Sequence, residues 1–132
     1  DLIEADPRAA VDPHSDAFRR TVELAIDMKA QIVGADLREA GQREILNYGH
    51  TIGHALEKVT EYGRLLHGEA VSVGMMGAAY ISHAMGLLSE EEVGRQTALL
   101  KMFGLPRSVD GVDVDAVAAA MILQDFLEQK GT

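Results

Sequence analysis

Four residues that could bind or position a substrate recur between residues 43 and 54. They lie four, three and four positions apart: Arg43, Asn47, His50 and His54. These intervals place side chains on one face of an α-helix. Two histidines four residues apart can ligate one metal ion, or one can bind metal while the other handles a proton. The spacing therefore predicts a helix face that carries chemistry.

Two glycines lie in the same segment, where a solvated helix would carry Glu, Lys or Gln. Gly49 and Gly53 each cost a helix about 1 kcal/mol relative to alanine. Something must therefore approach the backbone closely there, either a second helix or a ligand. If it is only a helix, the two histidines are incidental to small-residue packing. The Arg, the amide and two imidazoles on one face favour a ligand.

A third histidine, His67, opens the next apolar segment in the run Leu66-His67-Gly68-Glu69. Antiparallel packing of the two helices would return His67 towards His50. Glu69 suits the positive N-terminal end of a helix. Alone, His67 is equally consistent with a cap or loop residue, but beside His50 it indicates a metal site.

Lys29 interrupts a stripe of the first long helix that otherwise looks buried, formed by Phe18, Val22, Ala25 and Ile32. A lysine in such a stripe usually extends its ammonium group to water. It can instead serve as a fixed cation for an anionic ligand. With 12 Lys and Arg against 21 Asp and Glu, the net charge is -9, which argues against nucleic-acid and anionic membrane partners. An anionic substrate would need local cations such as Lys29 and Arg43.

The capping residues and glycines predict an all-α fold, a single-domain antiparallel bundle of about five helices over residues 1–132. The expected helices are residues 16–34, 42–60, 67–85, 90–103 and 114–129. Residues 1–16 are expected to form a loop with at most a short helical turn. Ser89 and Glu92 form a capping-box pattern, and residues 70–84 are apolar or small on nearly every face, which predicts burial.

Two motifs together resemble the paired signature of the 3-dehydroquinate synthases. They are Asn47-Tyr-Gly-His50-Thr-Ile-Gly-His54-Ala-Leu-Glu57 and Leu66-His67-Gly-Glu-Ala-Val-Ser-Val-Gly-Met75. The resemblance covers approximately residues 20–105. It implies the helical C-terminal half of a cytoplasmic NAD- and zinc-dependent lyase of the shikimate pathway, hence of chorismate and aromatic amino acid biosynthesis. Such enzymes convert 3-deoxy-D-arabino-heptulosonate 7-phosphate to 3-dehydroquinate and release phosphate.

The resemblance also implies roles for particular residues. His50 and His67 correspond to two of three protein ligands of zinc or another divalent metal, and the third, a glutamate, lies upstream in the family. Glu39 and His54 resemble catalytic residues that handle protons near the substrate hydroxyls. The absence of cysteine excludes thiolate ligands and fits a cytosolic protein.

Lys29, Arg43 and Asn47 resemble the residues that hold the carboxylate and hydroxyl groups of the sugar-phosphate substrate. NAD binding is expected from an N-terminal domain absent from this chain, which contains no Gly-rich dinucleotide turn. The chain opens with Asp rather than Met, and we expect a fragment that is catalytically incomplete alone. An Asp-Lys-Lys segment usual in the family is replaced here by Asp125-Phe-Leu127, and Lys130 is not assigned as its substitute.

Three alternatives remain at this point. Sibling sugar phosphate cyclases, the 2-deoxy-scyllo-inosose and valiolone synthases, share the zinc motif, although Arg43 and Asn47 favour a substrate with a carboxylate. Iron-type polyol dehydrogenases also pair an H-x-x-x-H helix with a later histidine, but lack the Asn47-Tyr-Gly and His67-Gly-Glu runs. A non-catalytic helical module with structural histidines would differ in its zinc affinity. The family tends towards homodimers, but the sequence itself does not give the oligomeric state.

Overall fold

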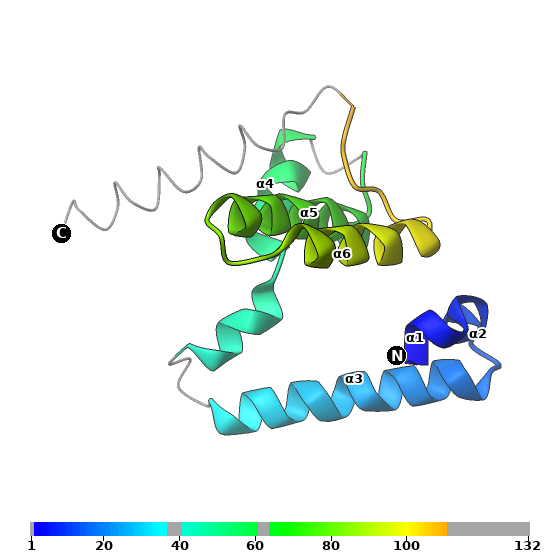
Figure 1. Cartoon of the computed structure of the whole chain (residues 1–132). Coiled ribbons are helices and arrows are strands. Elements are labelled where there is room, and N and C mark those ends of the chain that lie inside the picture. The colour runs from blue at the N-terminus through cyan, green and yellow to red at the C-terminus, as the bar shows by residue number, and fades with distance from the viewer. Residues whose placement is uncertain (1, 37–40, 61–63, 111–132) are drawn as a thin grey trace. The chain divides into compact units, whose positions relative to one another are not determined.

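The computed structural model describes residues 2–36, 41–60 and 64–110, and every regular element in these ranges is helical. Figure 1 shows the elements in order: α1 (Leu2–Ala5), α2 (Pro7–Val11), α3 (Asp16–Ala35), the 3-10 helix η1 (Gln42–Asn47), α4 (His50–Val59), α5 (His67–Ala84) and α6 (Glu90–Met102). The all-α prediction is confirmed. The helix expected at 114–129 lies outside the described residues. No helix in the described ranges is long and apolar enough to cross a membrane.

The chain forms two compact units, of which the first comprises residues 1–47. Its start was expected to be a loop with at most a short helical turn, and it contains two short helices, α1 and α2. The Asp6 carboxylate accepts the Ala9 N–H at 3.0 Å, and Pro7 occupies the first turn of α2. A capping aspartate followed by proline is a favoured helix start. Helix α3 begins where the sequence predicted, with the Ser15 hydroxyl accepting the Phe18 N–H at 2.9 Å.

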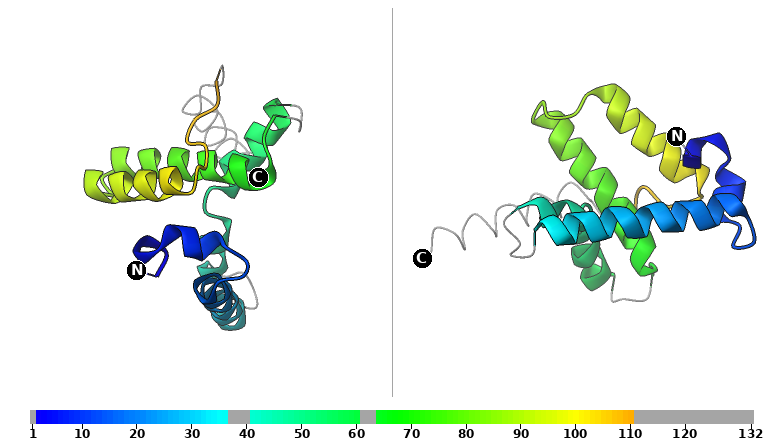
Figure 2. Two further views of the ribbon diagram at one scale, coloured as in Figure 1. Left: turned by 90° about the vertical axis from the view of Figure 1, so that its right-hand side faces the viewer. Right: turned by 90° about the horizontal axis from the view of Figure 1, so that it is seen from below.

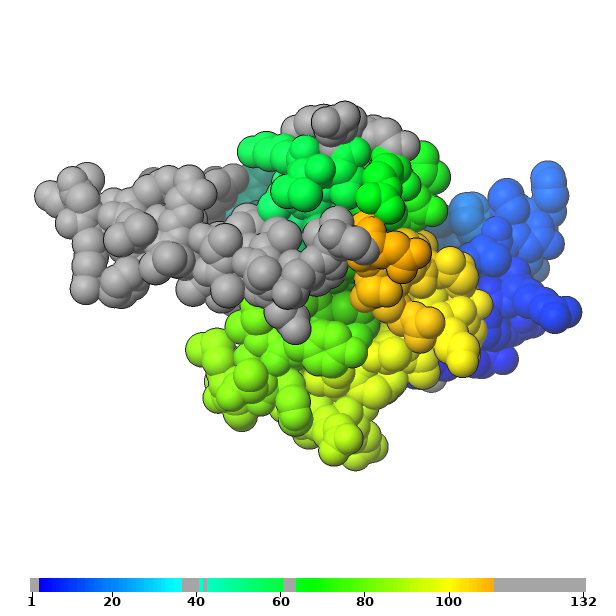
Figure 3. Space-filling view, turned by 90° about the horizontal axis from the view of Figure 1, so that it is seen from above, coloured from blue at the N-terminus to red at the C-terminus, as the bar shows by residue number. Residues whose placement is uncertain are grey.

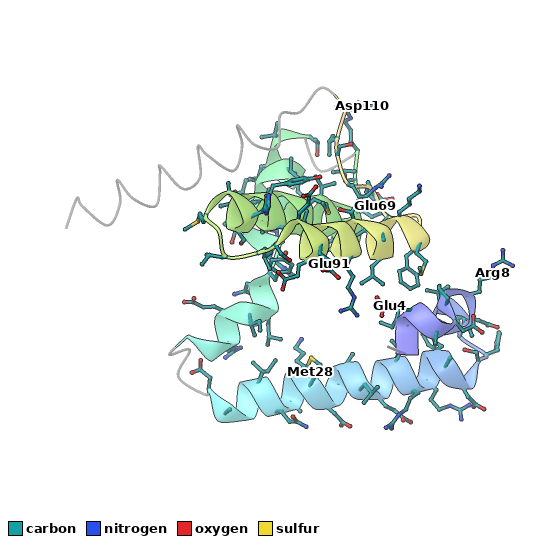
Figure 4. All side chains as sticks on the ribbon, in the orientation of Figure 1. Glu4, Arg8, Met28, Glu69, Glu91 and Asp110 are labelled. Carbon is teal, nitrogen blue, oxygen red and sulfur yellow. The ribbon has the colours of Figure 1, made fainter. Side chains whose placement is uncertain are left out.

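The apolar stripe of α3 is not buried, which corrects the expectation for Lys29. No residue of α3 is buried, Val22 is 40% exposed and Met28, marked in Figure 4, is 62% exposed. The elements of this unit that pack against α3 are the short α1, α2 and η1, which are too small to cover a helix of this length. Lys29 therefore lies on an exposed helix and does not interrupt a buried stripe.

The expected helix over residues 42–60 is divided in two, which is a second correction. Gly49 adopts φ 78°, a left-handed conformation that ends η1 and starts α4. Only glycine takes this conformation without steric cost. In addition, η1 has the tighter 3-10 winding, with three residues per turn. The residues from Arg43 to His54 therefore do not share one continuous helix face.

The second unit, residues 48–132, is organised around close contact between α4 and α5. A Cβ atom placed on Gly74 of α5 would lie 2.1 Å from the Gly49 carbonyl oxygen and 2.8 Å from the Gly53 nitrogen. The two backbones therefore touch at glycines, as the sequence suggested. The middle of α5 is buried, as predicted, through Ala70, Ser72, Val73, Gly74, Met76, Gly77 and Ala79. Tyr80, which was expected to be buried as well, is 50% exposed.

Two apolar clusters complete this unit. One joins α4 to α5 through Ile52, Leu56 and Val73 with Val109, and the other joins α5 to α6 through Met76, Ala79, Val93 and Leu100. Helices α5 and α6 run in opposite directions on either side of a turn (Figure 2), where Gly86 has φ 73°. The segment 105–110, orange in Figure 3, is attached to α5 by the Ser72 hydroxyl, which donates to the Pro106 carbonyl at 2.7 Å.

The glycine contact gives a direct stability test. Gly74→Ala forces backbone atoms of α4 and α5 apart, and we expect the free energy of unfolding to fall by about 3 kcal/mol. Gly94→Ala is the matched control, since Gly94 lies in α6 with nothing within 4 Å of its added Cβ. That change should raise stability by up to about 1 kcal/mol. Urea unfolding followed by circular dichroism measures both, and similar effects of the two changes would contradict the close contact.

The capping box of α6 predicts a pH-dependent contribution to stability. The backbone N–H and the hydroxyl of Ser89 donate to the Glu92 carboxylate, each at 2.8 Å, and these bonds lower the pKa of Glu92. A carboxylate with a lowered folded-state pKa stabilises the fold above its unfolded pKa of about 4.3. That contribution disappears as pH falls through the folded pKa.

We therefore expect Glu92→Gln to reduce the free energy of unfolding at about pH 7 and to have less effect at about pH 3. Glu91→Gln is the control, because Glu91 (Figure 4) directly precedes Glu92 and carries the same charge but is not part of the capping box. A Glu92→Gln effect that stays constant over this pH range would show that the carboxylate charge is not what stabilises the helix start.

Candidate metal centre

Three histidines from two helices converge in the second unit. His50 and His54 lie on successive turns of α4, and His67 is the first residue of α5. The ring centroids are 5.6 Å apart for His50 and His67, 5.4 Å for His54 and His67, and 6.0 Å for His50 and His54. The expected return of His67 towards His50 is confirmed. The glycine contact produces this convergence, because it brings the backbones of α4 and α5 together.

Glu57 lies between two of these rings. Its Oε2 atom is 2.9 Å from His54 Nδ1, and its Oε1 atom is 3.1 Å from His67 Nδ1. The Glu57 side chain is only 12% exposed, whereas those of His54 and His67 are more than half exposed. Hydrogen bonds from His54 and then from His67 lower the pKa of Glu57. Each oxygen of one carboxylate thus serves a different imidazole, from a different helix.

The third ring is oriented by the backbone. His50 Nδ1 is 3.3 Å from the Tyr48 carbonyl oxygen. All three Nδ1 atoms therefore face an oxygen that accepts hydrogen bonds, so in the neutral rings we assign the proton to Nδ1. The Nε2 atoms are then left with lone pairs available to a metal or to a substrate proton.

The separations between the ring centroids are close to those of imidazoles that share a tetrahedral metal ion. With Zn–N bonds of about 2.0–2.1 Å, each ring centroid lies about 3.2 Å from the metal, and a tetrahedral angle separates two centroids by about 5.2 Å. The observed separations of 5.4–6.0 Å are slightly larger. Neutral imidazoles with Nδ1 bonded to an oxygen are the usual donors to zinc.

A second group of possible metal ligands shares two histidines with the three-histidine cluster. Among the described residues, His54, Glu57 and His67 each offer one ligand atom, and these atoms lie within 4.8 Å of one another. A metal that used Glu57 together with the two Nδ1 atoms would have to replace both hydrogen bonds. A metal bound through Nε2 atoms would leave those bonds intact.

The turn before His50 is fixed by Tyr48, which the sequence reasoning passed over. The Tyr48 hydroxyl donates to Gln96 Oε1 at 2.8 Å and approaches the Met75 carbonyl at 3.3 Å. Gln96 also donates to the Met75 carbonyl at 2.9 Å. Burial raises the pKa of Tyr48. This network connects the start of α4 to α5 and α6, and so holds the carbonyl that orients His50.

The remaining predicted residues belong to the first unit or lie outside the described ranges. Lys29 is exposed on α3, Arg43 is partly buried in η1, and Asn47 is exposed at the end of η1. The Arg43 backbone N–H donates to Asp36 Oδ2 at 3.0 Å. Glu39 lies outside the described residues. Substrate contact by Lys29, Arg43 and Asn47, and catalysis by Glu39, stay predictions.

Glu57 is the site residue that sequence reasoning missed, although it closes the first histidine motif. Its signal was the spacing of three from His54, which places both on adjacent turns of one helix. Spacing does not reveal the second bond to His67, because that bond depends on the packing of α5 against α4. A glutamate in the last turns of a helix otherwise resembles an ordinary solvated residue.

Residues 1–125 match the family model described as 3-dehydroquinate synthase C-terminal. The 3-dehydroquinate synthase of Corynebacterium jeikeium is 48% identical over 91% of this chain and 32% of its own length. That of an Arthrobacter species is 51% identical over 80% of this chain and 29% of its own length. The chain thus spans about a third of the length of these relatives.

A solved structure is also similar. A 2-epi-5-epi-valiolone synthase from Streptomyces hygroscopicus, with NAD+ and Zn2+ bound, aligns with a TM-score of 0.76 at 26% identity. The alignment covers 92% of this chain and 34% of that protein.

Proposed function

The chain belongs to the family of 3-dehydroquinate synthase C-terminal domains, and we propose that it supplies the metal- and substrate-binding helices of such an enzyme. The proposed reaction converts 3-deoxy-D-arabino-heptulosonate 7-phosphate to 3-dehydroquinate with release of phosphate. The observation that carries the proposal is the convergence of His50, His54 and His67, with every Nδ1 facing an oxygen. The relatives named 3-dehydroquinate synthase support the choice of reaction.

His50 and His67 are the proposed metal ligands, through their Nε2 atoms. Two imidazoles leave room for a third protein ligand, a glutamate from the part of the enzyme outside this chain, and for the substrate. Zinc bound there would polarise a substrate hydroxyl and orient the ring that carries it. His50 comes from α4 and His67 from α5, so the glycine contact between these helices sets the distance between the two donors.

His54 is proposed to accept or return a proton at a substrate hydroxyl. Its Nδ1 atom is bonded to Glu57, which leaves Nε2 as the basic atom. Positioned imidazoles of this kind typically contribute 10²–10⁴-fold to a rate, as an order-of-magnitude figure. Glu39 is proposed as a second group that handles protons. NAD, proposed to be bound by the N-terminal domain of the whole enzyme, would accept and return the hydride.

Lys29, Arg43 and Asn47 are the proposed substrate ligands. A guanidinium binds a carboxylate through two parallel hydrogen bonds, and lysine supplies a point charge. Since the chain is acidic overall, with a net charge of -9, these cations would provide the local attraction that an anionic substrate needs.

The valiolone synthase neighbour favours a second candidate, another sugar phosphate cyclase reaction on the same helices. Its overall similarity is high, but its identity is 26%, compared with 48% and 51% for two 3-dehydroquinate synthases. A substrate carboxylate distinguishes the dehydroquinate reaction, and Arg43 with Asn47 suits that group. We therefore place the dehydroquinate reaction first.

Zinc binding tests the metal proposal. Isothermal titration of this chain with Zn2+ should saturate at about one ion per chain, and His50→Ala or His67→Ala should remove most of that binding. His14→Ala is the matched control, because His14 lies in the first unit, outside the cluster. In the whole enzyme, the two cluster changes should abolish turnover without unfolding the protein. Wild-type turnover in either variant would contradict the ligand assignment.

Substrate binding tests the role of Arg43. In the whole enzyme, Arg43→Ala should raise KM for the sugar phosphate by about 10- to 100-fold, the loss expected for a hydrogen bond between charged groups. Arg19→Ala is the control, since Arg19 is 70% exposed and pairs with Asp16 at 3.2 Å. An unchanged KM, or loss of the helical circular dichroism signal in Arg43→Ala, would show that Arg43 does not bind substrate or acts structurally.

A further inference from the structure

Glu57 holds two imidazoles that have different proposed tasks. Its Oε2 atom is bonded to His54 Nδ1 and its Oε1 atom to His67 Nδ1, at 2.9 and 3.1 Å. His54 is on the same helix as Glu57, whereas His67 opens the next helix. The Glu57 side chain is mostly covered, at 12% exposure. One carboxylate therefore fixes both rings at the junction of α4 and α5.

A carboxylate accepts hydrogen bonds and, when ionised, donates none. Both Nδ1 atoms must therefore present hydrogen to Glu57, and both Nε2 atoms are then without hydrogen in the neutral rings. The two carboxylate oxygens lie 2.9 and 3.1 Å from the two Nδ1 atoms, so each oxygen accepts from one ring. A glutamine at the same position could accept from one ring only, because its amide nitrogen is a donor.

An ordinary surface ion pair would give the same distances but different consequences. Exposed pairs contribute little to stability, and their loss leaves distant chemistry unchanged. By contrast, oxygen partners that orient metal-binding histidines typically affect metal affinity by about 10- to 100-fold when they are removed. Neutralising the carboxylate therefore distinguishes the two roles. It should weaken metal binding if Glu57 orients the rings, and leave it unchanged if Glu57 only forms a surface ion pair.

We propose that Glu57 is a positioning residue whose carboxylate sets the tautomer and ring orientation of His54 and His67 together. His67 then presents Nε2 to the metal, and His54 presents Nε2 to the substrate proton. This inference rests on the proposed function for the identity of the metal and the substrate. The effect of Glu57 on the tautomers does not depend on either.

The test compares Glu57→Gln with Glu69→Gln in this chain. Glu69, near the start of α5 (Figure 4), accepts the Leu66 N–H at 2.8 Å and is not the oxygen partner of any of the three rings. The amide oxygen of a glutamine can accept the same Leu66 N–H, so the control removes one charge close to His67 and retains the helix start. Urea unfolding of both variants establishes that the helices remain folded.

The first measurement uses 15N-labelled histidine without metal at about pH 8, where unperturbed imidazole is neutral. In the unmodified chain and in Glu69→Gln, His54 and His67 should both appear with hydrogen on Nδ1 and none on Nε2. In Glu57→Gln, at least one ring should become a mixture of tautomers. Unchanged tautomers of both rings in Glu57→Gln would overturn the inference, whatever the zinc result.

The second measurement is competition titration with Zn2+ alone. Glu57→Gln should weaken zinc binding about 10- to 100-fold relative to Glu69→Gln. The hydrogens on Nδ1 of His54 and His67 should persist in the zinc-bound unmodified chain. Their loss on zinc binding would instead make Glu57 and the Nδ1 atoms the ligands, and would overturn the positioning role. If the unmodified chain binds no zinc, the metal proposal fails and the tautomers alone decide the role of Glu57.

Discussion

The arrangement of the second unit depends on the contact between the backbones of α4 and α5 at glycine residues. A single methyl group on Gly74 would overlap the carbonyl of Gly49. This close approach places the start of α5 beside the first turns of α4, and it brings His67 within 6 Å of both other rings, measured between centroids. The cost of Gly53 and Gly74 inside their helices, about 1 kcal/mol each, is thus offset by packing that assembles the site.

The sequence predicted the helices whose ends are defined by capping side chains. Ser15 and Ser89 begin α3 and α6, and Gly86 follows α5, as expected. It did not predict the break at Gly49, because a glycine inside a helical pattern is compatible with either a continuous helix or a turn. The positive φ of Gly49 arises in the folded unit, where Tyr48 is tied to Gln96 and the Met75 carbonyl.

The approach of the three histidines could be predicted from local features of the sequence. His50 and His54 are four residues apart on one helix, and the next helix runs back antiparallel and begins with His67. Arg43 and Asn47 were expected on the same helix face, but the break before α4 ends that face and both residues belong to η1 in the first unit. The proposed role of Glu57 required three-dimensional structure, since one of its two hydrogen bonds to imidazole comes from His67 of α5. Likewise, the exposure of Lys29 depends on how much of α3 the short helices of its own unit cover.

The charges around His67 explain how a cation could be held at this position. His67 lies at the N-terminus of α5, where the helix dipole places partial positive charge that opposes a bound metal ion. Glu69 accepts the Leu66 N–H in that first turn, and Glu57 accepts from the His67 ring. Two carboxylates thus offset the dipole without occupying the Nε2 positions. Negative charge is therefore concentrated where a cation would bind. Any attraction for an anionic substrate must come from that cation and from separate basic residues.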